Sequence, residues 1–157
     1  MSLGSDVQLL REAPFFRGFD DDHLRLIAFS AESRHVRKDE VVVEAGRPQH
    51  SAYLVNDGLL IARRDARAGE EEGRSARRFE RGALIGDLAL ITEMKAHETI
   101  VAAENSSVLQ IRRSMFKRLL DEYPDIAEAL RDKLTEGLAD TVEEIKRAGL
   151  RLGAAGS

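Results

Sequence analysis

The spacing of apolar residues changes along the chain from a helical period to strand-like alternation, and then back again. Apolar residues at Val7, Leu9 and Leu10 predict a short helix within residues 6–16. Three consecutive aspartates, residues 20–22, precede a second amphipathic segment, and acidic residues in this position favour the start of a helix. The chain is therefore predicted to begin with a helical segment.

From position 35 onward the residues become β-branched and alternate between apolar and polar, as is typical of strands. Turn signals that contain glycine interrupt this stretch at residues 46–48 and 56–58. The strands that we expect are residues 35–43, 51–55, 59–64, 74–79, 99–103 and 108–111. Short strands separated by turns at regular spacing favour a β-roll or a sandwich over a parallel sheet.

After Arg113 the pattern returns to a helical period. Ser114 suits the cap of a helix over Met115–Glu122, and Pro124 opens a longer helix that reaches about Arg147. The longer helix carries an apolar stripe made of Ile126, Leu130, Leu134, Leu138, Val142 and Ile145. The first half of this stripe is expected to cover the strands, and the second half extends beyond what a small roll needs to bury.

Length and composition describe one ordinary globular domain. The chain has 157 residues, and we expect a single domain over residues 6–150 with a flexible tail over 151–157. Its net charge of −4 gives no general attraction to nucleic acid or to anionic lipid, and without cysteine it has no disulfide or thiolate site. No apolar run is long enough to span a membrane and no secretory signal is visible, so we expect a cytoplasmic protein without membrane attachment.

The residue types that carry most enzyme chemistry are scattered along the chain. The four histidines, His23, His35, His50 and His97, show no metal-ligand spacing. No nucleophile stands at a useful spacing from a base, and the glycine-rich phosphate loop of nucleotide hydrolases is absent from the sequence. We therefore expect no enzyme activity, no metal site and no prosthetic group.

The most informative segment is Gly82–Val101, which reads GALIGDLALITEMKAHETIV. After Gly86, the residues Asp87–Ile91 have the pattern of one helical turn, and a polar loop and a β-branched strand follow. Backbone amides exposed at a helix start, close to a flexible turn, form a site for an anion. The segment is therefore the leading candidate for ligand binding.

Residues 86–89, Gly-Asp-Leu-Ala, resemble the first half of the phosphate-binding cassette of cyclic nucleotide-binding domains, in which Gly-Glu-Leu-Ala precedes Arg-Ser-Ala-Thr. Residues 96–99, Ala-His-Glu-Thr, stand where the second half would be. The order of elements over Leu9–Ala148 also matches that family. The resemblance implies a mainly β fold with flanking helices: an antiparallel β-roll, or jelly roll, with an N-terminal helical segment and a C-terminal helix pair.

In this family the ligand lies in the roll, and the short helical turn caps its pocket. The binding residues that the resemblance implies are Ile85, Gly86, Asp87, Leu88, Ala89, Ala96, His97, Glu98 and Thr99. The implied ligand is cyclic AMP (cAMP) or cyclic GMP (cGMP). Ala96 replaces the arginine that grips the cyclic phosphate, and losing such a two-pronged contact weakens binding by about two to four orders of magnitude.

The residues near Ala96 leave several interpretations open. Asp87 replaces the family's glutamate, and it either reaches a ribose hydroxyl or caps the helical turn. Lys95 or a protonated His97 would supply a positive charge for the phosphate, unless both belong to the solvated surface. Glu98 repels an anion if its side chain faces the pocket, and it is harmless if strand alternation turns it outward.

Two functions are compatible with these residues. The first is a regulatory sensor that binds a cyclic nucleotide or a related anion and relays this to its C-terminal helices. The alternative is a degenerate domain without a ligand, which serves dimerisation or protein docking. Since the matching helix pairs with its twin in the family's bacterial regulators, we expect a homodimer through Leu138, Val142 and Ile145, against packing on its own roll as the alternative. No helix-turn-helix follows, so no direct nucleic-acid contact is expected, and the effector is not identified.

Overall fold

The computed structural model describes residues 3–63, 77–133 and 135. The chain divides into two compact units, Met1–Leu119 and Leu120–Ser157. In the second unit the described residues form a helix over 124–133, in which Ile126 and Leu130 are buried. The rest of the predicted apolar stripe and the predicted tail lie outside the described residues.

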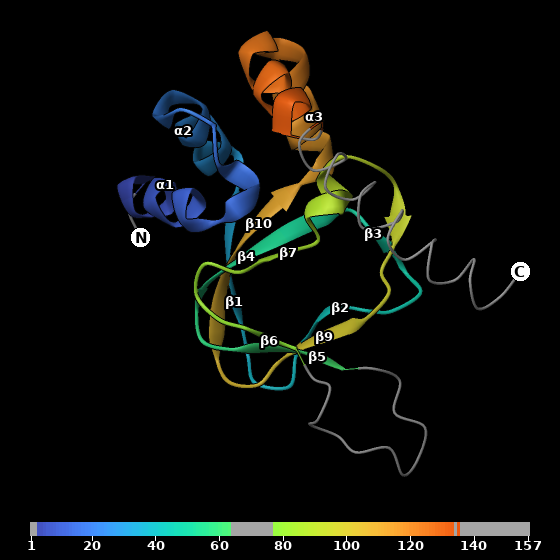
Figure 1. The fold of residues 1–157 in the computed structure, drawn as a ribbon. Helices are drawn as coiled ribbons and strands as arrows, with labels where there is room; N and C mark the ends of the chain where they lie inside the picture. Colours follow the sequence, from blue (N-terminus) through green and yellow to red (C-terminus); the bar gives the residue numbers. More distant parts are fainter. Residues whose placement is uncertain (1–2, 64–76, 134, 136–157) are drawn as a thin grey trace, which may run out of the picture. The chain divides into compact units, whose positions relative to one another are not determined.

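The first unit is built on antiparallel sheets (Figure 1). One sheet has the order β1 (Glu32–Val36), β10 (Ser106–Arg112), β4 (Ser51–Asp57), β7 (Leu84–Ile85). A second has the order β2 (Val41–Val43), β9 (Thr99–Ala102), β5 (Leu60–Arg63), β6 (Arg78–Phe79). A short third sheet pairs β3 (Pro48–Gln49) with β8 (Met94–Lys95). These sheets confirm the predicted antiparallel β-roll.

An apolar cluster of described residues lies between the sheets in the interior of the roll. Alternation along each strand turns every second side chain inward, which explains why residues far apart in the sequence share this cluster. Its buried members are Val36, Val43, Tyr53, Val55, Leu60, Ala62, Ile85, Ala96, Ile100, Ala102 and Val108. Burial of each large apolar side chain stabilises the fold by about 1.5–3 kcal/mol.

The N-terminal helical segment consists of α1 (Leu3–Glu12), the short 3₁₀ helix η1 (Pro14–Phe16) and α2 (Asp21–Ser30). Figure 1 shows α1 and α2 beside each other next to β4, and α1 contacts both of them. Asp20 caps α2, because its side chain accepts a hydrogen bond from the His23 amide at 2.9 Å. The predicted helical start and its acidic cap are therefore confirmed.

Several boundaries differ from the sequence prediction. The helix predicted within residues 6–16 is α1 followed by η1, the strand predicted over 108–111 extends over Ser106–Arg112, and the short strands β3, β7 and β8 were not predicted. Pro48 begins β3 and is not the end of a turn, and Asn56 and Asp57 continue β4, so that the chain turns at Gly58. The predicted cap at Ser114 is wrong, because α3 (Arg113–Glu122) follows β10 directly and Ser114 lies inside its first turn. Residue propensity alone did not indicate these boundaries, because pairing with distant strands forms β3 at Pro48 and extends β4 and β10 beyond the predicted ends. The extension of β10 to Arg112 also brings the start of α3 to Arg113.

The predicted strand over 35–43 is two strands, β1 and β2, separated at residues 37–40. Asp39 there has a positive φ of 71°, and its amide donates to the Ala102 carbonyl at 2.8 Å. Of the predicted strands over 59–64 and 74–79, the described parts form β5 and β6, while residues 64 and 74–76 lie outside the description.

Candidate functional site

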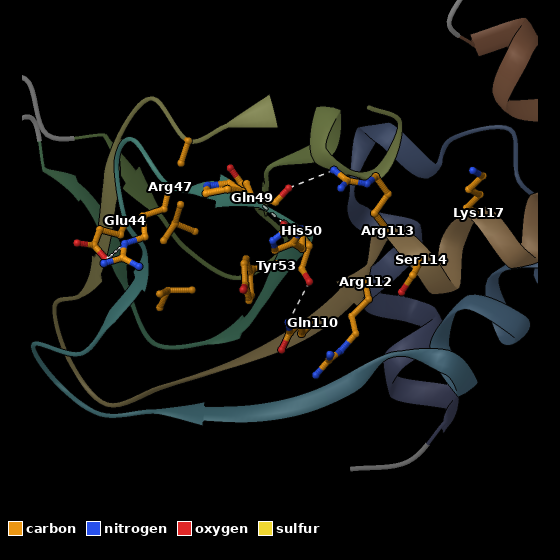
Figure 2. Close-up of a pocket in the computed structure, with 15 residues that line it drawn as sticks. Glu44, Arg47, Gln49, His50, Tyr53, Gln110, Arg112, Arg113, Ser114 and Lys117 are labelled. Atoms are coloured by element: carbon orange, nitrogen blue, oxygen red, sulfur yellow. Dashed lines mark hydrogen bonds and ion pairs between the residues drawn. The ribbon is translucent and has the colours of Figure 1, made fainter. Parts of the chain in front are cut away.

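A cavity of about 640 Å³ lies at the meeting point of β2, β3, β4, β10 and the first turns of α3 (Figure 2). Its lining residues are Val42, Val43, Glu44, Arg47, Pro48, Gln49, His50, Ser51, Tyr53, Ala96, Gln110, Arg112, Arg113, Ser114 and Lys117. The volume falls within the range of about 300–1,000 Å³ that is usual for small-molecule sites. All of these residues belong to the first unit.

One wall of the cavity is a set of polar side chains on the paired strands β4 and β10. Tyr53 faces Gln110, and Ser51 faces Arg112, so alternation places these four side chains on one face. The side-chain amide of Gln110 donates to the Ser51 hydroxyl at 2.9 Å, and Arg34 donates to the side-chain Oε1 of Gln110 at 3.3 Å. The buried polar groups are hydrogen-bonded in place, which makes this wall a preorganised surface for a polar ligand.

Gln49 lies between the cavity and the helical turn after Gly86. Its side chain is buried, and its amide donates to the Ser51 carbonyl at 3.2 Å. Gly86 has a positive φ of 80°, and a Cβ added to it would stand 2.0 Å from Gln49 Nε2. Glycine is therefore required at position 86 for two reasons: the positive φ, and the Gln49 side-chain amide that packs against it.

The first half of the predicted cassette forms the expected helical turn, η2 (Asp87–Leu90), with Gly86 as its N-cap. Ile85 and Ala89 are buried, whereas Leu88 is 56% exposed. The Asp87 carboxylate is exposed and accepts from the Leu88 amide at 2.9 Å. These five predicted site residues are not among the residues that line the cavity.

The second half of the cassette contributes one lining residue, Ala96, which is buried. Lys95 and His97 are exposed and do not line the cavity. Glu98 forms an ion pair with Arg77 at 2.5 Å, so its charge is compensated away from the lining. The Thr99 hydroxyl accepts from the Ala45 amide at 3.0 Å and holds the turn over residues 44–47.

Arg113 joins the start of α3 to the cassette. Its guanidinium donates to the carbonyl oxygens of Thr92 at 2.9 Å, Gln49 at 3.2 Å and Ala89 at 3.4 Å. Figure 2 shows Arg113 reaching across to Gln49. One side chain therefore links η2, the loop that follows it and β3 to the first residue of α3.

The charge of the cavity lining is mainly positive. Arg47, Arg112, Arg113 and Lys117 line it, against the single carboxylate of Glu44. Arg47 pairs with Glu44 at 3.2 Å, and Arg112 pairs with Glu32 at 3.1 Å. Surplus positive charge around a partly enclosed space favours an anionic ligand, although the whole chain carries a net negative charge.

Sequence reasoning missed most of this lining. A usable signal was present: Gln49, Ser51 and Gln110 are polar residues within or beside strands whose other members are mostly apolar. Polar residues at inward positions of a strand need partners and therefore mark a site. Which of them face one another depends on strand register, and residue types do not reveal register across long separations.

Substitution of Gly86 by alanine tests the packing of Gln49 against the cassette. We expect Gly86→Ala to lower the free energy of unfolding by about 2–3 kcal/mol, because the positive φ alone costs about 1–2 kcal/mol and Gln49 must also move. Urea unfolding measures the change. In a Gln49→Ala background the same substitution should cost less, and an equal cost in both backgrounds would contradict the packing.

Comparison with known proteins identifies the class of this β-roll. The model of the cyclic nucleotide-binding domain family matches residues 33–123, more than half of the chain. The chain therefore belongs to the cyclic nucleotide-binding domain family. The antiparallel roll with flanking helices agrees with this membership.

Individual relatives agree with this membership. The chain is 28% identical over 128 residues to an uncharacterized NTE family protein of Mycobacterium tuberculosis, covering 81% of this chain and 21% of that protein. It is 29% identical over 111 residues to a cAMP-dependent protein kinase regulatory subunit of Colletotrichum orbiculare, covering 71% and 27%. The chain thus spans about a fifth to a quarter of the length of these curated relatives.

A solved structure gives the same fold. The N-terminal domain of a transcriptional regulator from Streptomyces coelicolor A3(2) superposes with a TM-score of 0.80 at 22% identity, covering 87% of this chain and 94% of that one. Within the part of the chain that the structure describes, no helix has the length and apolar character to cross a membrane. The same described residues contain no group of three or more histidines and carboxylates that could hold a metal ion.

Proposed function

We propose that the chain is a regulatory sensor whose β-roll binds a small anionic ligand, in the simplest case cAMP or cGMP. The observation that carries the proposal is the 640 Å³ cavity, which combines a preorganised polar wall with four cationic side chains. A nucleotide needs this combination, since its phosphate requires positive charge and its sugar and base require hydrogen-bond partners. The cAMP-dependent kinase subunit among the relatives supports a cyclic nucleotide.

A ligand in this cavity is proposed to act through Arg113. Arg113 lines the cavity and also donates to the carbonyls of Ala89 and Thr92. A ligand that moves the Arg113 guanidinium or these carbonyls would therefore change the position of the first turn of α3. Regulation then requires that the ligand bind two arrangements of α3 with unequal affinity. In this proposal the chain itself is not an enzyme, and the effector that it regulates is another protein or domain.

A second candidate function is a degenerate domain that has lost its ligand. Two observations favour it: Ala96 carries no charge, and Gln49 fills the space against Gly86. Such a domain would persist for docking or for dimerisation. The homodimer through Leu138, Val142 and Ile145, the single domain over 6–150, the tail over 151–157 and the cytoplasmic location stay predictions.

Titration calorimetry with cAMP and cGMP at low salt tests the first function. We expect saturable binding with a Kd between about 10 μM and 1 mM, or about −7 to −4 kcal/mol, because the charged cavity replaces only part of the missing arginine contact. Binding should weaken as sodium chloride is raised, since the partly exposed charges are screened. The largest changes in backbone amide chemical shift on addition of nucleotide should occur at the residues that line the cavity.

The absence of heat and of amide shifts up to about 5 mM nucleotide, where a free energy of about −3 kcal/mol would still be seen, would contradict ligand binding. That result would favour the degenerate domain, and a sedimentation measurement of the oligomeric state would then test the dimer.

A further inference from the structure

Arg47 and Ala96 lie side by side on neighbouring segments. The Ala96 amide donates to the Arg47 carbonyl at 2.9 Å, and the Gly46 amide donates to the Ala96 carbonyl at 2.8 Å. The next residue pair, Pro48 and Lys95, continues this ladder as β3 and β8. Both Arg47 and Ala96 line the cavity. An arginine on the adjoining segment therefore stands beside the position where the cassette lacks one.

The guanidinium of Arg47 is available to a ligand. Its side chain is 74% exposed, and its ion pair with Glu44 joins two exposed residues three positions apart (Figure 2). Pairs of this kind contribute only about 0–1 kcal/mol, so an anion with better geometry displaces the carboxylate. The planar fork of arginine suits the paired oxygens of a phosphate.

The other cations of the lining are less suited to this role. Arg113 is held in place by three backbone carbonyls, to which its Nη1 donates, and Arg112 pairs with Glu32 across β1 and β10. Lys117 offers a point charge without a fork. Arg47 is also the one whose backbone pairs with Ala96, and both residues line the cavity.

We propose that Arg47 binds the anionic group of the ligand in place of the missing arginine at position 96. The inference rests on the proposed function, and it makes the ligand an anion of nucleotide size whose phosphate faces the turn over residues 44–47. The rest of such a ligand meets Tyr53, Gln49 and Gln110, which supply an aromatic ring and two carboxamides. A carboxamide both donates and accepts hydrogen bonds, as recognition of a base edge requires.

The test measures cAMP affinity by calorimetry on Arg47→Gln, Arg47→Lys and a control. Arg47→Gln should weaken cAMP binding about 10- to 100-fold, because one charge-assisted contact is lost. The cAMP affinity of Arg47→Lys should lie between that of the original chain and that of Arg47→Gln, because lysine keeps the positive charge and lacks the planar guanidinium. The control, Arg78→Gln, removes an arginine with a similarly exposed side chain that pairs with Glu80 at 4.0 Å and does not line the cavity. It should leave the affinity unchanged.

A rescue variant separates binding from a structural effect. Arg47→Gln with Ala96→Arg should recover most of the lost affinity, since the guanidinium then comes from the neighbouring position. If Arg47→Gln binds cAMP as tightly as the original chain does, the inference is overturned and the proposed function stands. If the original chain binds neither nucleotide, the proposed function fails and the role of Arg47 fails with it.

Discussion

Substitution of Arg113 by alanine is expected to lower the free energy of unfolding by about 2–4 kcal/mol. The guanidinium donates to three backbone carbonyls, of Gln49, Ala89 and Thr92, each of which lies at least 21 positions from Arg113 in the sequence. Its removal leaves part-buried acceptors without their donor, and hydrogen bonds from a charged group are stronger than neutral ones. Urea unfolding followed by circular dichroism measures the loss.

The adjacent arginine provides a matched control. Arg112 has an exposed side chain and pairs with Glu32 at 3.1 Å, so Arg112→Ala should cost less than about 1 kcal/mol. Equal losses in the two variants would show that Arg113 does not hold the cassette. If ligand binding is established, Arg113→Ala should also uncouple ligand binding in the cavity from any response of α3.

The second large effect is expected at Gly58, where Gly58→Ala should destabilise the fold by about 3–5 kcal/mol. Its φ is 93°, and an added Cβ would stand 2.7 Å from the Ser106 Cα, which is backbone and cannot rotate away. The Ser106 hydroxyl also accepts from the Leu59 amide at 3.0 Å and donates to the Glu104 carbonyl at 2.8 Å. The substitution therefore disturbs the contact between two turns of the roll.

Gly46 separates the conformational cost from the steric one. Its φ of 84° is similar, but nothing lies within 4 Å of an added Cβ, so Gly46→Ala should cost only about 1–2 kcal/mol. Thermal unfolding of the two variants side by side makes the comparison. A loss at Gly58 no larger than the loss at Gly46 would contradict the close approach of Ser106.

One part of the candidate site depends on local sequence, and the other part depends on residues that are distant in the sequence. The helical turn after Gly86 was predictable, because a glycine followed by an acidic residue and an apolar run is a local pattern. The cavity lining was not, because Gln49, Tyr53 and Gln110 meet only through the pairing of β4 with β10 and the packing beneath Gly86. The open interpretation of Glu98 was decided by Arg77, a residue 21 positions away.

By itself the sequence determined the helical start after residues 20–22, the succession from helices to short strands and back to helices, and the cassette turn, because propensity, periodicity and turn chemistry act within a few residues. The antiparallel roll followed from the resemblance of residues 86–89 and of the element order to a known family. Only the tertiary structure decided that Arg47 lies beside Ala96, that Gln49 packs on Gly86 and that Arg113 joins the cassette to α3. These neighbours depend on strand register and on side-chain packing across long sequence separations. A shift of one residue in a strand would turn different side chains into the cavity.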